Sequence, residues 1–152
     1  MAEILCKDCK AEGVTTFRPL GKKSTVRCTT HHRKFVEAGK DRAHARYVKA
    51  TYNLEPEQYQ AIKAAQNGKC FICAKSTGAA RRLSCDHDHS CCDGPRSCGK
   101  CVRALLCRPC NDLLGVVRDD IEVLKRAIIV LRDHPAQAVL NSLDIIESEV
   151  PQ

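Results

Sequence analysis

Cysteine spacing is the feature that most constrains how this chain can fold. The 152 residues include 12 cysteines, while aromatic residues make up only 4% and tryptophan is absent. A large aromatic core is therefore excluded, and small modules need another source of stability. Most of the cysteines stand in C-x-x-C pairs, which present two thiolates to one tetrahedral zinc ion. The sequence thus predicts a small α+β fold whose modules are stabilised by zinc binding.

The chain shows no sign of export or membrane insertion. No apolar N-terminal run leads to a small-residue cleavage site, so we expect no signal peptide. No stretch approaches the roughly 20 apolar residues of a membrane span. We therefore expect a cytoplasmic protein, and in that reducing compartment cysteines more often bind metal than form disulfides.

Two half-sites near the N-terminus predict a first zinc site. Cys6 and Cys9 form a C-x-x-C pair, and Cys28 and His31 form a C-x-x-H pair after an 18-residue gap. This separation is typical of a small zinc ribbon with short strands, which we place at residues 1–34. His32 could replace His31, and the alternative is an N-terminal arm with unpaired thiols.

Further thiols predict two more zinc sites. Paired knuckles at Cys70, Cys73, Cys107 and Cys110 predict a structural zinc, because four thiolates leave no open coordination position. A possible third zinc has the candidate ligands Cys91, Cys92, Cys98 and Cys101, with Cys85 as another candidate. The alternative is a reduced loop with idle thiols. We expect three zinc ions per chain.

The segment "CDHDH" lies inside the loop that the four-cysteine zinc would clamp. It contains Asp86, His87 and His89, and Asn111 directly follows the last zinc ligand. Carboxylate and amide oxygens suit Mg²⁺ or Mn²⁺. A histidine beside such an ion can take a proton from water near neutral pH. On a basic chain this set predicts phosphodiester hydrolysis; the alternative is a turn whose histidines bind zinc.

Positive charge is concentrated in the first three quarters of the chain. The net charge of +7 divides into +7 for residues 1–50, +4 for residues 51–118 and −4 for residues 119–152. Such a distribution favours a polyanionic partner such as DNA, although a merely solvated basic surface would look the same. A basic linker helix at residues 35–51, with Arg42 and Arg46, could lie along DNA or simply connect two modules.

Three further helices are expected. Residues 55–67 have Pro56 in the first turn and Gly68 as a stop, and Tyr59 should face the core. Apolar residues recur at helical spacing within 119–134, and a second helix follows. This C-terminal pair, residues 119–152, should either cover the core or pair with a second subunit.

The order of the motifs carries a resemblance. A helix, then "AQNGKCFIC", "CDHDH" and "GKCVRALLCRPCN", resembles the phage recombination endonuclease VII family within the HNH or ββα-metal nucleases. The resemblance covers about residues 52–118. It implies a strand with "LSCDHDH", a strand or loop with "VRALLC" and a helix opening near Asn111. It also implies a metal-dependent DNA endonuclease that leaves 5′-phosphate and 3′-hydroxyl ends and acts on branched DNA as a homodimer, in the host cytoplasm if phage-encoded.

Roles follow residue by residue from this resemblance. Asp86 and Asn111 would bind the catalytic Mg²⁺, His87 would be the general base, and His89 would aid the phosphate or leaving group. Apart from these roles, the positive charges of Arg81, Arg82 and Arg103 make them candidate phosphate contacts. Ala104 stands where the family commonly has glycine. Leu114 stands where some members have an acidic ligand, so that either this ligand is missing or Asp112 substitutes for it.

Two other functions fit parts of the sequence. One is a nuclease of the same fold that acts as a nicking, packaging-associated or restriction enzyme. The other is a non-catalytic zinc-ribbon protein that binds nucleic acid. The "DHDH" run together with Asn111 favours an enzyme, since a zinc scaffold needs neither.

Overall fold

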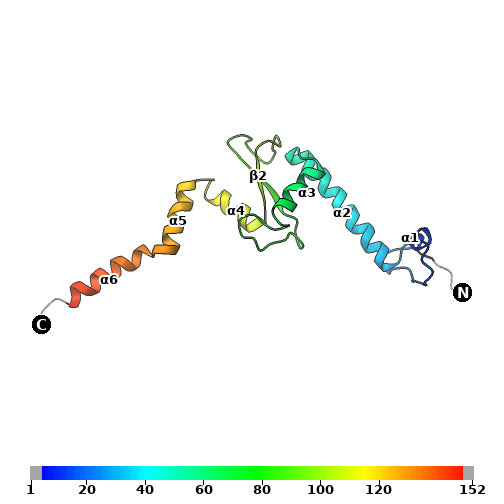
Figure 1. Ribbon diagram of the computed structural model, residues 1–152, viewed down its shortest axis with the longest axis horizontal. Coiled ribbons are helices and arrows are strands. Elements are labelled where there is room, and N and C mark those ends of the chain that lie inside the picture. Colours follow the sequence, from blue (N-terminus) through cyan, green and yellow to red (C-terminus); the bar gives the residue numbers. More distant parts are fainter. Residues whose placement is uncertain (1–4, 149–152) are drawn as a thin grey trace. The chain divides into compact units, whose positions relative to one another are not determined.

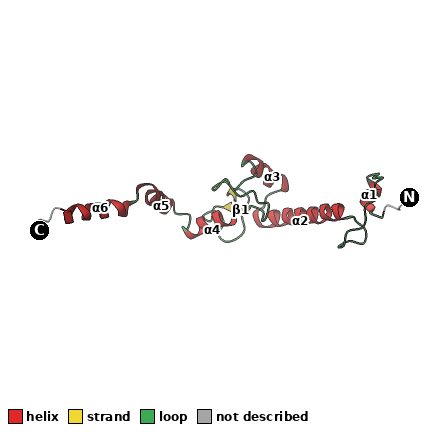
Figure 2. Cartoon of the chain, turned by 90° about the horizontal axis from the view of Figure 1, so that it is seen from below, coloured by secondary structure: helices red, strands yellow, loops and turns green. Residues whose placement is uncertain are grey.

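The computed structural model of the protein describes residues 5–148 and confirms a small α+β fold (Figures 1 and 2). Its elements are α1 (Lys7–Ala11), α2 (Thr29–Tyr52), α3 (Pro56–Ala65), β1 (Ser84–His87), β2 (Val102–Leu106), α4 (Arg108–Val116), α5 (Ile121–Asp133) and α6 (Pro135–Ser148). The two strands form one sheet.

The chain forms two compact units, and the boundary between them runs through both strands. The first unit consists of Met1–Asn67 and His87–Ala104, and the second of Gly68–Asp86 and Leu105–Gln152. Each unit is therefore built from two separate stretches of sequence. The four-segment division made from the sequence stays a prediction.

The N-terminal part of the first unit is more helical than expected. Residues 5–28 contain the short helix α1 and one isolated bridge between Leu20 and Cys28, instead of the short strands expected there. Two of the four candidate ligands are carried by helices, since Cys9 lies in α1 and His31 in the first turn of α2. The buried core of this segment consists of Cys6, Cys9 and Cys28, with Val14 and Leu20 packed against them.

Helix α2 is longer than the predicted linker. It begins at Thr29, directly after Cys28 as N-cap, and its 24 residues include the whole of the expected helix at 35–51 (Figure 1). It ends at Tyr52, and the C-cap residue Asn53 adopts a left-handed conformation and donates its backbone N–H to the Lys49 carbonyl. Most of α2 faces solvent, and its buried residues near the C-terminal end are Val48 and Tyr52.

Helix α3 follows after a short turn and begins as predicted. Pro56 occupies the first turn, and the Glu55 backbone N–H donates to Gln58 Oε1 at 2.8 Å as part of a capping box. Tyr59 is buried, which confirms its place in the core, and its ring lies edge-on to His44 with centroids 4.8 Å apart.

The second unit has a small core around the end of β2. Leu105 and Leu106 are fully buried, and Leu83, Cys70 and Cys85 are buried as well. Cys107 occupies the N-cap position of α4, whose first turn contains Pro109, a residue whose fixed φ suits a helix start. The helix begins three residues before Asn111, so that residue lies inside the first turn of the helix.

The C-terminal helices leave their apolar residues in solvent. Asp120 caps α5, its side chain accepting from the backbone N–H groups of Glu122 and Val123. No residue of α5 is buried. Large apolar side chains are exposed on both helices, namely Ile121, Ile128, Ile129, Val130, Leu131, Val139, Leu140 and Leu143. Within residues 5–148, no helix combines the length and the apolar character needed to cross a membrane.

Candidate functional site

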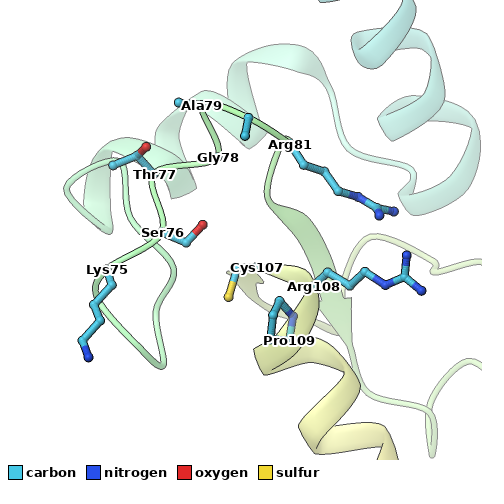
Figure 3. A pocket seen from close by; sticks show the side chains of 10 residues that line it. Lys75, Ser76, Thr77, Gly78, Ala79, Arg81, Cys107, Arg108 and Pro109 are labelled. Carbon is cyan, nitrogen blue, oxygen red and sulfur yellow. The ribbon is translucent and has the colours of Figure 1, made fainter.

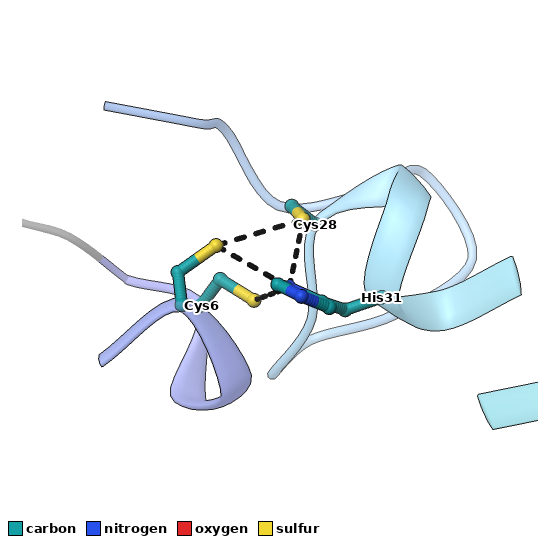
Figure 4. A group of neighbouring side chains, drawn as sticks. Cys6, Cys28 and His31 are labelled. Carbon is teal, nitrogen blue, oxygen red and sulfur yellow. Dashed lines mark hydrogen bonds between the residues drawn. The ribbon is translucent and has the colours of Figure 1, made fainter. Parts of the chain in front are cut away.

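The first candidate metal group joins α1 to the start of α2. The ligand atoms of Cys6, Cys9, Cys28 and His31 all lie within 4.8 Å of one another, and all four residues are buried. His31 Nδ1 is 3.3 Å from the sulfurs of Cys6 and Cys9 and 3.4 Å from that of Cys28 (Figure 4). Sulfur and nitrogen ligands of one tetrahedral zinc ion are about 3.5 Å apart. This group therefore has the composition and the dimensions of a Cys₃His zinc site.

A carboxylate orients the histidine of this group. His31 Nε2 lies 3.0 Å from Glu12 Oε2, which leaves Nδ1 directed at the three sulfurs. The structure thus brings His31, and not His32, to the cysteines. Burial alone would raise the pKa of Cys6, but hydrogen bonds from the backbone N–H groups of Cys28 and Cys9 and from the side chains of His31 and Cys9 together lower it to about 6. Glu12 was not predicted, because no spacing rule connects a carboxylate to the half-sites.

The second group lies in the second unit and has the expected four thiols. Cys70, Cys73, Cys107 and Cys110 place their sulfurs within 4.8 Å of one another, and the Cys73 and Cys107 sulfurs are 3.8 Å apart. Sulfurs bound to one tetrahedral zinc ion lie about 3.8 Å apart. Backbone N–H groups of Ser76 and Lys75 lower the pKa of Cys73 to about 6. The group could hold zinc with no coordination position left for a substrate.

The third group lies in the loop after β1. The sulfurs of Cys91, Cys92, Cys98 and Cys101 are also within 4.8 Å of one another, but Cys91 and Cys98 are exposed. Cys85 stands outside all three groups. Burial raises the pKa of the Cys85 thiol to about 12, so it remains a neutral core residue.

The end of β1 presents the acidic and imidazole groups. Asp86 and His87 are its last two residues, and each is only 5% exposed. His87 Nε2 lies 3.2 Å from the carbonyl oxygen of Gly94. A carbonyl can only accept, so the ring proton is on Nε2 and the lone pair is on Nδ1. Gly94 was not predicted to contribute, because its contact with His87 is made by the backbone carbonyl.

Two neighbouring rings surround His87 within the first unit. The Tyr52 ring at the end of α2 has its centroid 6.1 Å from that of His87, and the exposed His89 ring has its centroid 4.6 Å from that of His87.

Asp88 forms hydrogen bonds within the turn that follows β1. Its Oδ1 accepts from the Ser90 hydroxyl at 2.7 Å and from the Ser90 backbone at 2.8 Å, and these bonds lower the pKa of the Asp88 carboxyl. Asp88 therefore shapes the turn.

The remaining predicted site residues lie on different units. Asn111 is half-buried in the first turn of α4 and belongs with Asp86 to the second unit, whereas His87 and His89 belong to the first. Asp112 lies 3.3 Å from Arg108 Nε in an ion pair along α4.

A pocket of about 380 Å³ in the second unit brings basic side chains together. Its lining comes from residues 75–81 and from Cys107, Arg108 and Pro109. Figure 3 shows the guanidinium groups of Arg81 and Arg108 extending in the same direction. Arg81 was predicted to contact phosphate, whereas Arg108, which lies between the candidate zinc ligands Cys107 and Cys110, was not singled out from the sequence. Among the other arginines predicted to contact DNA, Arg42, Arg46 and Arg103 are exposed and Arg82 is half-buried.

Comparison with known proteins gives one consistent result. Residues 45–133 match recombination endonuclease VII, which is more than half of the chain. The Gene 59 protein of Mycobacterium phage D29 is 43% identical over 136 residues, which is 89% of this chain and 77% of that protein. The Gene 59 protein of Mycobacterium phage L5 is 40% identical over the same coverage. No solved structure matches the chain significantly. With motifs, matched segment and phage relatives in agreement, the chain belongs to the recombination endonuclease VII family.

Proposed function

We propose that this protein is a metal-dependent DNA endonuclease with an HNH-type ββα-metal core. Membership of the endonuclease VII family indicates a nuclease that acts on DNA. The observation that supports the finer proposal is the end of β1, where the buried Asp86 precedes a buried His87 whose Nε2 is engaged by a backbone carbonyl. The order β1, β2, α4 along the chain is the order that such a core requires.

Asp86 and Asn111 are the proposed ligands of the catalytic cation. Their donor set is one carboxylate and one amide oxygen, which suits Mg²⁺ or Mn²⁺ and differs from the thiolates that select zinc. When bound, such a cation supplies Lewis-acid stabilisation of the scissile phosphate and of the departing 3′ oxygen.

His87 is the proposed general base. With its proton on Nε2, the ring accepts the proton of an attacking water at Nδ1. His89, exposed beside it, would contact the phosphate or the leaving group. The products would carry 5′-phosphate and 3′-hydroxyl ends.

The rest of the chain would support this chemistry. The Cys₃His group and the four-cysteine group of the second unit (Cys70, Cys73, Cys107 and Cys110) would each hold a structural zinc. Residues 1–34 would form the N-terminal zinc module, 35–51 a basic linker and 52–118 the nuclease core. Residues 119–152 would form a dimerisation pair of helices. Phage relatives support action in the host cytoplasm.

DNA would bind through the basic side chains described above. Arg81 and Arg108 line one pocket in the second unit, and the exposed Arg42 and Arg46 lie on α2. Such contacts position the phosphate backbone without reading base sequence. We therefore expect binding to weaken steeply as salt rises.

A cleavage assay tests the proposal. Purified zinc-loaded protein is incubated with linear, nicked, forked and four-way DNA, with and without added Mg²⁺. We expect cleavage only with Mg²⁺, and preference for four-way DNA would support work on junctions. Nicking of linear duplex alone would instead favour the nicking alternative. Tight DNA binding without any cleavage would contradict the enzyme and support a non-catalytic zinc protein.

A further inference from the structure

The third cysteine group has the dimensions of a metal site. Three sulfur pairs, Cys91–Cys98, Cys91–Cys92 and Cys98–Cys101, are each 3.9 Å apart. This separation agrees with the edge of about 3.8 Å expected for four sulfurs around one zinc ion. The Cys98 backbone N–H also donates to Cys92 Sγ at 3.3 Å, which ties the two halves of the group together.

Its surroundings differ from those of the other two groups. The first group is entirely buried, and the second buries Cys70 and Cys110, whereas here Cys91 and Cys98 are exposed and the other two cysteines are half-buried. A metal at this position would therefore contribute little to a hydrophobic core. Its effect would fall on the loop of residues 88–101 itself.

One side of that loop is fixed to the end of α2. The Ser97 backbone N–H donates to the Thr51 carbonyl at 2.9 Å, and Asn53 Nδ2 donates to the Cys98 carbonyl at 3.1 Å. Gly99 has φ +86°, and a Cβ built there would lie 2.9 Å from the Asn53 carbonyl oxygen. Glycine is thus required where the loop meets the helix.

The other side of the loop leads to His87. The Asp88 carbonyl accepts from the backbone N–H groups of Cys91 and Cys92 at 3.2 and 3.1 Å, and the Asp88 N–H donates to the Cys101 carbonyl at 3.0 Å. Gly94, which accepts from His87 Nε2, lies between the Cys91–Cys92 pair and Cys98. The position of its carbonyl therefore depends on how the two halves of the cysteine group are held together.

We propose that Cys91, Cys92, Cys98 and Cys101 bind a zinc ion that positions His87, by fixing the loop whose Gly94 carbonyl holds His87 Nε2. The zinc site stands on its own geometry, while its effect on catalysis rests on the proposed role of His87 as general base. Cross-linking the loop removes alternative loop conformations that would release the ring. The cysteines are positioning residues, since none of them is placed at the reacting atoms.

A pair of substitutions at Cys98 separates ligation from other effects. Cys98 is exposed, so Cys98→Ser should leave the core folded, and Cys98→His restores a ligand in a Cys₃His set. Asp93→Ala, at an exposed position of the same loop, is the matched control. Zinc per chain is counted by native mass spectrometry. The His87 tautomer is read from ¹⁵N-histidine NMR in alkaline buffer, and circular dichroism checks the fold.

We expect three zinc ions in the wild type and in Cys98→His, and two in Cys98→Ser. In Cys98→Ser the His87 ring should become a mixture of tautomers, and kcat should fall about 10-fold or more with KM for DNA nearly unchanged. Cys98→His should recover both signals, and Asp93→Ala should behave as the wild type.

Two results would overturn the inference. A wild type with two zinc ions, whose Cys98 is alkylated under native conditions, has no third site. Loss of one zinc in Cys98→Ser without any change in the His87 tautomer or in kcat leaves the zinc without a positioning role. If the wild type cleaves no DNA, the proposed function fails, while the zinc count and the His87 tautomer still decide this inference.

Discussion

A backbone carbonyl holds the histidine proposed to do the chemistry, and this allows its role to be separated from the stability of the fold. His87 donates to Gly94 and ligates none of the three metal groups. We expect His87→Ala to keep its zinc content and far-UV circular dichroism while kcat falls at least about 10²-fold, the typical contribution of a general base. Cleavage of supercoiled plasmid and of the preferred branched DNA measures this loss.

A second histidine serves as control for this experiment. His134 caps α5 in a left-handed conformation with φ 45°, far along the chain from β1. His134→Asn suits that conformation, because asparagine tolerates positive φ, and it should retain wild-type activity. Near-wild-type turnover by His87→Ala would remove the general-base assignment, whatever happens in His134→Asn.

Residues whose contribution depends on local spacing could be predicted from the sequence, and others could not. Cys6, Cys9 and Cys28 predict a metal site, because a spacing of two residues between ligands allows both to bind one ion. Gly94 acts through its backbone carbonyl, and Glu12 contacts His31 from 19 residues away in the sequence. No local sequence pattern reveals either contact. The choice of His31 over His32 needed the helical turn that starts α2.

The group of Cys70, Cys73, Cys107 and Cys110 connects loop, strand and helix elements of the second unit. It joins the segment before β1 to the N-terminus of α4, and the buried residues around it are few. We expect Cys107→Ser to lose one zinc and to unfold this unit, since structural zinc contributes on the order of 10 kcal/mol of apparent binding energy. Thermal circular dichroism and zinc analysis measure both effects.

Cys85→Ala provides the matched cysteine control. Cys85 is buried in β1 but belongs to no metal group, so its removal should cost only packing, about 1 kcal/mol, with the zinc count unchanged. Equal zinc content in Cys107→Ser and wild type would show that the metal is held elsewhere.

Elements were predictable where capping and periodicity are local. The expected start of α3 agrees with its capping box, and α5 begins at Ile121, two residues after the expected start, with the acidic Asp120 as its N-cap. Residues 5–28 were assigned strands wrongly, because turn-rich composition cannot show that Cys9 and His31 sit on helices. The start of α2 at Thr29 was missed for the same reason.

At the scale of the whole molecule, the exposed apolar side chains of α5 and α6 require an explanation. Their apolar spacing predicted either core packing or pairing with a second subunit, and no residue of α5 is buried. Leu131 is 79% exposed, and Val139 on α6 is 60% exposed. A stable dimer interface of about 1,600 Å² needs such surfaces. We expect the protein to form a homodimer through these helices.

Light scattering after size exclusion tests this expectation. The wild type should have about twice the 16.8 kDa mass of the chain. Leu131→Glu should shift the protein to the monomer, because burying an unpaired carboxylate at an apolar contact is costly. Gln137→Glu adds the same charge at a polar exposed position and should remain dimeric. A wild type that is monomeric at micromolar concentration, or a Leu131→Glu variant that stays dimeric, would place the interface elsewhere or exclude it.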